Sequence, residues 1–259
     1  MSYREMGIRR RICGLVLGGV LGLLPVSTNA EQPSITPSDP AFQQAVEEMM
    51  EQYIRTHPEV IEQTLQTLQT KREAEERERV RNLITTKQDD LLNDPNSPVS
   101  GNLNGDISIV EFFDYRCGYC KRVAGAVTQL QMDDPKVRVI YKDFPILGEA
   151  SVFAASAALA SKAQGKHEAF HEALLASQHE LTQENIFTIA AAVGLDTERL
   201  TADMQAPTIQ ATIDRNRKLA KELGINGTPG FIIGTELIPG ALDLKDLKSL
   251  VRQVRDEKR

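Results

Sequence analysis

Two cysteines three positions apart are the residues of this 259-residue sequence best suited to chemistry. The sequence has three cysteines, Cys13, Cys117 and Cys120. Cys13 lies in an N-terminal segment that we expect to be removed, which leaves Cys117 and Cys120 in the mature chain. Because one pair so close in sequence cannot cross-link a domain of this size, its spacing predicts reversible thiol-disulfide chemistry.

The residues around the pair predict a strand before it and a helix after it. Residues 107–114 form a mostly apolar run, and residues 121–132 repeat apolar side chains at helical spacing. A cysteine at the start of a helix meets unpaired backbone N–H groups, which favour its thiolate. We therefore predict that Cys117 is the attacking, solvent-exposed thiol. Cys120, one turn further along, is predicted to be the shielded thiol that resolves a mixed disulfide.

A zinc site is an alternative use of two cysteines at this spacing. Structural zinc takes four protein ligands, and no further cysteine remains in the mature chain. His167 and His171 lie four residues apart and His179 follows, but no third ligand is spaced to complete a site. We interpret these histidines as exposed polar positions on a helix and predict no metal site.

The order of the expected elements indicates an α/β sheet interrupted by a helical insertion. A turn-rich segment at residues 93–105 marks a boundary, and we place the start of the catalytic domain near residue 98. The expected elements are a strand at 107–114, a helix at 121–132, a strand at 137–141, a helical block at 149–221, a strand at 231–234, a hairpin to 237–238 and a helix from Asp243.

The region before this domain has a helical pattern of its own. Asp39 and Pro40 are residues typical of a helix start, and the apolar side chains of the first helix share one face: Phe42, Val46, Met49 and Tyr53. We interpret residues 40–97 as a helical oligomerisation and linker region in which residues 40–93 join copies of the chain. The alternative is a helical subdomain folded back on the catalytic domain.

The first 30 residues have the pattern of a secretory signal, with arginines, an apolar run and a final small residue. We predict cleavage after Ala30, a disordered N-terminus at 31–39 and export into a bacterial periplasm. The alternative, a retained membrane anchor, has too short an apolar run. Cleavage removes four arginines and one glutamate from the 30 basic and 36 acidic side chains, leaving a net charge of −9. This charge argues against a nucleic-acid partner.

The segment from Glu111 to Cys120, Glu-Phe-Phe-Asp-Tyr-Arg-Cys-Gly-Tyr-Cys, resembles the active-site segment of the DsbA family in the thioredoxin superfamily. Gly-Thr-Pro-Gly at 227–230 resembles the cis-proline loop of that superfamily. With the helical N-terminal extension, the sequence is most similar to the ScsC (suppressor of copper sensitivity) branch and its Com1-like relatives. The resemblance implies an α/β, thioredoxin-like fold with a helical insertion at about 146–221, preceded by an N-terminal helical extension.

The resemblance also implies roles for individual residues. Cys117, Cys120 and Glu111 become the catalytic residues, with Glu111 as a buried acid that exchanges a proton with Cys120. The residues implied to contact substrate are Gly118, Tyr119, Thr228 and Pro229. Taken from the strand pattern alone, Glu111 could instead face solvent at a sheet edge, and Lys142 is a candidate ionic partner across the sheet.

We therefore expect a periplasmic thiol-disulfide oxidoreductase that acts on cysteine-containing exported proteins, needs no added cofactor and is reset by a membrane redox partner. An oligomer favours disulfide isomerase or reductase activity, and a monomer favours a DsbA-like dithiol oxidase. A Cu(I)-binding copper-tolerance protein, with both thiolates on the metal, is an alternative from another class. A further alternative is a surface protein whose N-terminal helices bind a partner and whose dithiol is vestigial.

Overall fold

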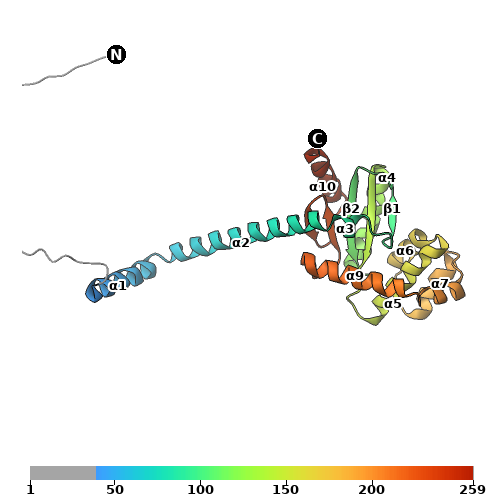
Figure 1. Ribbon diagram of the computed structural model, residues 1–259, viewed down its shortest axis with the longest axis horizontal. Coiled ribbons are helices and arrows are strands. Elements are labelled where there is room, and N and C mark those ends of the chain that lie inside the picture. The colour runs from blue at the N-terminus through green and yellow to red at the C-terminus, as the bar shows by residue number, and fades with distance from the viewer. Residues whose placement is uncertain (1–38, 259) are drawn as a thin grey trace, which may run out of the picture. The chain divides into compact units, whose positions relative to one another are not determined.

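The computed structural model describes residues 39–258 (Figure 1). The predicted signal segment, its cleavage point and the predicted disordered stretch up to residue 38 lie outside the described residues. The chain divides into two compact units between Gln63 and Thr64. Within residues 39–258, no helix combines the length and the apolar character needed to cross a bilayer.

The first unit contains α1 (Pro40–Thr56) and the start of α2 (Pro58–Thr86). The side chain of Asp39 caps α1 by accepting a hydrogen bond from the Ala41 N–H at 2.9 Å, and Pro40 occupies the first turn, as predicted. His57 separates the two helices. No residue of α1 is buried, so its apolar face has no partner in the described part of the chain.

The second unit is built on a mixed five-stranded sheet with the order β1-β3-β2-β4-β5. β2 and β3 run parallel, and the other neighbouring strands run antiparallel. Gly234 makes the β4–β5 turn with a φ of 64°, which favours glycine. The strands are β1 (Val99–Gly101), β2 (Ile107–Phe113), β3 (Val137–Asp143), β4 (Gly230–Ile233) and β5 (Glu236–Pro239).

Alternating side chains of the central strand β2 supply two hydrophobic cores. Ile107, Ile109 and Phe113 face the core beneath α4 (Gly118–Asp133) and α10 (Leu244–Glu257). Val110 and Phe112 face the opposite core, which contacts α3 (Gln88–Leu92), α9 (Pro207–Leu223) and the last turns of α2. The sheet therefore has helices on both faces, the arrangement expected of an α/β fold (Figure 1).

The predicted helical block is a series of short helices between β3 and β4. Buried alanines of α5 let neighbouring helices approach closely, and Asp196 and Thr182 cap the helices that follow them. The series consists of α5 (Glu149–Ala160), the 3₁₀ turn η1 (Ser161–Gln164), α6 (His167–Ala176), α7 (Gln183–Ala192), α8 (Thr197–Asp203) and α9.

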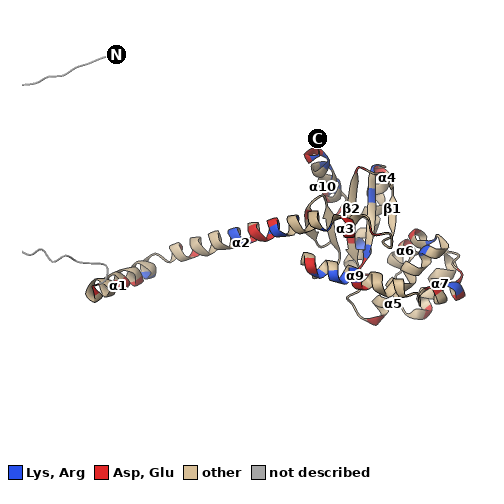
Figure 2. Ribbon diagram, viewed as in Figure 1, with Lys and Arg blue, Asp and Glu red and all other residues tan. Residues whose placement is uncertain are grey.

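Two features differ from the sequence analysis. Residues 99–101 form an edge strand that pairs with β3, and three residues after a proline carry no periodic signal that predicts it. The compact unit also begins at Thr64 rather than near residue 98. Its earlier start has a packing reason, because Val80, Ile84 and Leu91 are buried in the core that contains Phe112. Directly upstream of Val80, every residue of α2 from Lys71 to Arg79 except Ala74 is charged (Figure 2).

This packing predicts that the end of α2 stabilises the catalytic unit. Ile84 is buried against the sheet, so Ile84→Ala should lower the free energy of unfolding by about 2–5 kcal/mol. Leu103, which is exposed, provides the matched control, and Leu103→Ala should change it by less than about 0.5 kcal/mol. Urea unfolding followed by circular dichroism measures both variants. Equal stability of the two variants would contradict the packing.

Candidate active site

Cys117 lies at the junction between β2 and α4. It is the N-cap residue of α4, with φ −72° and ψ 116°, and its side chain makes no capping hydrogen bond. Its N–H donates to the Asp114 carbonyl at 3.0 Å, and its carbonyl accepts from the Lys121 N–H at 3.1 Å. These bonds hold the sulfur at the end of α4 where the backbone N–H groups lack partners within the helix.

The two cysteines are free thiols in different surroundings. Cys117 is 7% exposed and Cys120 is 0% exposed. Burial raises the pKa of Cys120 far above that of an ordinary thiol, and the charge of Glu111 raises it further. Cys117 is more buried than predicted, because its Sγ donates to the Thr228 carbonyl at 3.2 Å and the loop at Thr228 covers it. It is still the more accessible thiol of the pair.

The loop at residues 227–230 contains the cis peptide bond expected from its resemblance to a cis-proline loop, between Thr228 and Pro229. The Pro229 carbonyl accepts a hydrogen bond from the Gly240 N–H at 2.8 Å. Gly230 then begins β4 and pairs with Phe112 of β2. The sheet therefore brings Thr228 and Cys117 together although 111 residues separate them.

Glu111 is a buried acid beneath the dithiol. It lies on β2, is 3% exposed, and burial raises its pKa to about 8. It lines a pocket of about 430 Å³ formed with residues of α4, β3 and α6. A carboxyl group with this pKa can hold or release a proton near neutral pH. Its charge acts on Cys120, so the two groups lie close enough for their ionisation to be linked.

Lys142 is not the partner of Glu111, and the sequence-based suggestion is wrong. Lys142 pairs in register with Phe112, so its side chain leaves the sheet on the opposite face from Glu111. Its Nζ donates to the Asp90 carbonyl at 2.6 Å and to Ser97 Oγ at 2.7 Å. Lys142 therefore anchors the segment between α3 and β1.

The interpretation of His167 and His171 as exposed residues is also wrong. Both are buried on α6, facing the sheet, whereas His179 is exposed. His171 Nδ1 lies 2.9 Å from the Tyr115 hydroxyl, and burial lowers the pKa of His171 to about 3. Within residues 39–258, no three histidine, cysteine or acidic side chains are grouped as metal ligands. The aromatic surroundings of His171 make it a neutral packing residue.

Asp114 is a site residue that the sequence analysis did not single out. Its carboxylate accepts hydrogen bonds from the backbone N–H groups of Arg116, Ile146 and Leu147 at 2.8, 2.9 and 3.0 Å. It also accepts from Ser151 Oγ at 2.8 Å. Asp114 thus ties the turn before Cys117 to the start of the insertion. An aspartate directly after a buried strand was the available signal.

The two residues between the cysteines are exposed at the start of α4. Gly118 has open space where a Cβ would lie, with no atom within 4 Å. Tyr119 is 58% exposed, and the Arg122 guanidinium lies 4.3 Å from the centre of its ring. The surface beside Cys117 therefore consists of a bare backbone position, an aromatic ring and the loop at Thr228.

Residues 108–252 match the family model described as a DSBA-like thioredoxin domain. A thioredoxin-like oxidoreductase from Silicibacter pomeroyi is 48% identical, with a TM-score of 0.64 over 65% of this chain and 97% of that chain. The thiol-disulfide exchange protein alpha-DsbA2 from Wolbachia pipientis is 36% identical, with a TM-score of 0.64 over 68% of this chain and 95% of that chain. ScsC from Proteus mirabilis is 29% identical, with a TM-score of 0.64 over 84% of this chain and 98% of that chain.

The curated relatives that the chain matches are Na(+)/H(+) antiporters, among them NhaA from Herminiimonas arsenicoxydans. That protein is 26% identical over 61% of this chain, and the match spans 25% of its own length. The chain therefore spans about a quarter of the length of these curated relatives. The match to ScsC covers 84% of this chain, against 65% for the Silicibacter pomeroyi protein, and it supports the ScsC-like branch.

The raised pKa of Glu111 predicts that stability falls as pH rises. The folded pKa of about 8 exceeds the ordinary value of about 4.3, so the folded protein keeps a proton that the unfolded chain releases between these values. The native protein should therefore lose about 4 kcal/mol of unfolding free energy between pH 4 and pH 8 that Glu111→Gln does not lose, so the variant gains this amount relative to the native protein. Urea unfolding of the reduced proteins measures this gain, and parallel pH profiles would contradict the assignment.

Proposed function

The chain belongs to the family of DSBA-like thioredoxin domains, and from this premise we propose that it is a thiol-disulfide oxidoreductase acting through Cys117 and Cys120. The observation that carries the proposal is the position of Cys117, at the N-terminus of α4 and in contact with Thr228 beside the cis peptide bond. Cys120 is fully buried behind it. This arrangement suits a cycle in which one thiol meets the client and the other acts within the protein.

In the reductive direction, the thiolate of Cys117 attacks a client disulfide. The client sulfur–sulfur bond breaks, one client sulfur leaves as a thiolate and takes a proton, and a Cys117–client disulfide forms. Cys120 then loses its proton and attacks the Cys117 sulfur, which releases the second client thiol. The client gains two electrons and two protons, and the protein holds a Cys117–Cys120 disulfide. Oxidation of a client is the reverse sequence.

We propose that Glu111 accepts the proton that Cys120 must lose. Burial disfavours the Cys120 thiolate, so the resolving step needs a base beside it. With a pKa of about 8, most Glu111 carboxyl groups are protonated at pH 7 and about a tenth are ionised, so the group can exchange a proton near neutral pH. Glu111 therefore takes the proton in the reductive direction and returns it in the oxidative direction.

The client-binding residues of the proposal surround Cys117. Thr228 and Pro229 present backbone to an extended segment of the client, and among the described residues the Thr228 N–H makes no hydrogen bond. Gly118 lets a client approach the end of α4, and the exposed Tyr119 ring supplies apolar contact. This surface is small and mostly backbone, which suits many client sequences.

We further propose that the protein works in the periplasm as an oligomer with disulfide isomerase or reductase activity. The predicted signal segment supports export. The exposed apolar side chains of α1, with no buried residue in that helix, support association of copies through residues 40–93. Its clients are then cysteine-containing exported proteins, and a membrane redox partner resets the dithiol.

Binding of Cu(I) through both thiolates fits the structure less well than exchange does. Such a site needs Cys120 as a thiolate, and burial opposes loss of its proton. Exchange needs that thiolate only briefly and only after Cys117 has formed a mixed disulfide. Titration of the reduced protein with Cu(I), followed by a reductase assay in the presence of a chelator, separates the two functions.

The exchange cycle predicts different defects for the two cysteines. Cys117→Ala should lower insulin reduction on the order of 1000-fold, because no attacking thiolate remains. In Cys120→Ala, Cys117 should still attack the client disulfide, but the Cys117–client mixed disulfide should accumulate, and intact-mass spectrometry detects it. Leu103→Ala, remote from the dithiol, is the control and should keep full activity. Equal defects without a trapped adduct would contradict the roles given to the two thiols.

The oligomer predicts that isomerase activity depends on the apolar face of α1. The double variant Met49→Lys and Tyr53→Lys should sediment as a monomer and should lose most reactivation of scrambled ribonuclease, while single-turnover disulfide reduction is kept. Gln44→Lys with Glu48→Lys places similar charges on the opposite face of α1 as the control. A native protein that sediments as a monomer would overturn the oligomer and favour a dithiol oxidase.

A further inference from the structure

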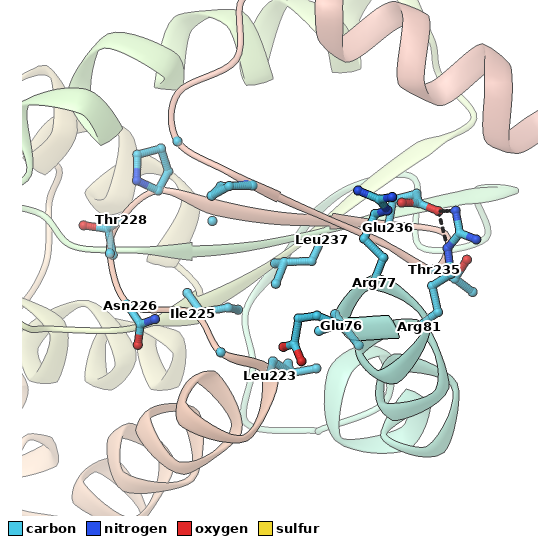
Figure 3. A pocket seen from close by; sticks show the side chains of 17 residues that line it. Glu76, Arg77, Arg81, Leu223, Ile225, Asn226, Thr228, Thr235, Glu236 and Leu237 are labelled. Atoms are coloured by element: carbon cyan, nitrogen blue, oxygen red, sulfur yellow. Dashed lines mark hydrogen bonds and ion pairs between the residues drawn. The ribbon is translucent and has the colours of Figure 1, made fainter. Parts of the chain in front are cut away.

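A pocket of about 440 Å³ lies on the face of the sheet opposite α4 and α10 (Figure 3). It is bounded by residues within 76–81 of α2, by residues 223–230 leading into β4, and by residues within 235–240 of the β4–β5 hairpin. All of these residues belong to the second compact unit. Neither the dithiol nor Glu111 lines the pocket.

The floor of the pocket is apolar and its rim is charged. Ile225 and Leu237 point into it (Figure 3), and Val80 lines it from α2. Strand alternation places Leu237 on this face, whereas its neighbour Ile238 packs with the core beneath α4 and α10. On the rim, Arg81 Nε donates to a Glu236 carboxylate oxygen at 2.8 Å. With a volume of about 440 Å³ and an apolar floor, the pocket has room for an apolar side chain as large as leucine or phenylalanine together with neighbouring peptide backbone.

The pocket shares the loop at residues 227–230 with the redox site. Thr228, Pro229 and Gly230 all line it, and the carbonyl of Thr228 accepts the hydrogen bond from Cys117 at 3.2 Å. The Thr228 N–H makes no hydrogen bond among the described residues, and no described strand pairs with the outer edge of β5. An extended peptide can therefore pair with this backbone at one end and reach the pocket a few residues further along.

We propose that this pocket is a client subsite that binds an apolar side chain a few residues from the client cysteine. The inference rests on the proposed exchange function and gives it a substrate preference, for segments in which cysteine lies near a large apolar residue. Such segments are buried in correctly folded proteins and exposed in misfolded ones. The subsite would therefore direct the dithiol towards clients whose disulfides need rearrangement.

The test measures how fast the reduced, full-length mature protein consumes two peptide–glutathione mixed disulfides. Both peptides have ten residues and one central cysteine, and they carry either leucine or serine two and four positions from that cysteine on both sides. Oxidised glutathione is the third substrate, because it is too small to reach the pocket. The native protein should react about tenfold faster with the leucine peptide than with the serine peptide.

Two variants remove the subsite in different ways. Leu237→Gln makes its floor polar, and Thr235→Trp blocks it from an exposed position on the hairpin. In both, the leucine preference should fall below about twofold, while the rate with oxidised glutathione stays native. Leu103→Gln, the same substitution at an exposed leucine outside the pocket, should keep the tenfold preference.

The outcomes separate the subsite from the function on which it rests. A native protein without a leucine preference, or a preference that survives in both variants, overturns the subsite and leaves the exchange function standing. Loss of reaction with oxidised glutathione in the native protein overturns both. A change of sedimentation in Leu237→Gln with unchanged peptide rates shows that the pocket joins copies of the chain and also overturns the subsite.

Discussion

The pairing of β2 with β4 is the constraint on which the site depends. Its register sets Phe112 opposite Gly230, so the last residues of β2 lie beside the first residues of β4. The thiol after β2 and the peptide before β4 then lie in hydrogen-bonding contact, 3.2 Å apart. A shift of one residue would turn the side chains of β2 to the wrong faces and exchange its two cores.

The same sheet gives the two thiols unequal surroundings. Cys120 packs into the core beneath α4, where an uncompensated charge is unfavourable, and Glu111 shares that environment. Burial disfavours the ionised forms of both Glu111 and Cys120, and two negative charges close together repel each other. Loss of a proton from one group therefore raises the pKa of the other. Asp114 stabilises this arrangement from outside the dithiol through four hydrogen bonds.

The sequence predicted the elements and the reactive pair because their signals are local. The apolar run of β2 and the capping residues of α1 and α10 are readable within a few positions. The partner of Lys142, the burial of His171 and the edge strand β1 depend on which face of the sheet each side chain takes and on pairings over tens of residues. Propensity carries no information about such contacts, which explains why the suggestions for Lys142 and His171 were wrong.

The central claim is that one thiol meets the client and the other is shielded by burial. Brief alkylation of the reduced protein with limiting iodoacetamide at pH 7, followed by peptide mapping, tests it most directly. The account predicts that Cys117 carries nearly all of the label and that Cys120 is labelled only after unfolding. Equal labelling, or preferential labelling of Cys120, would contradict the account.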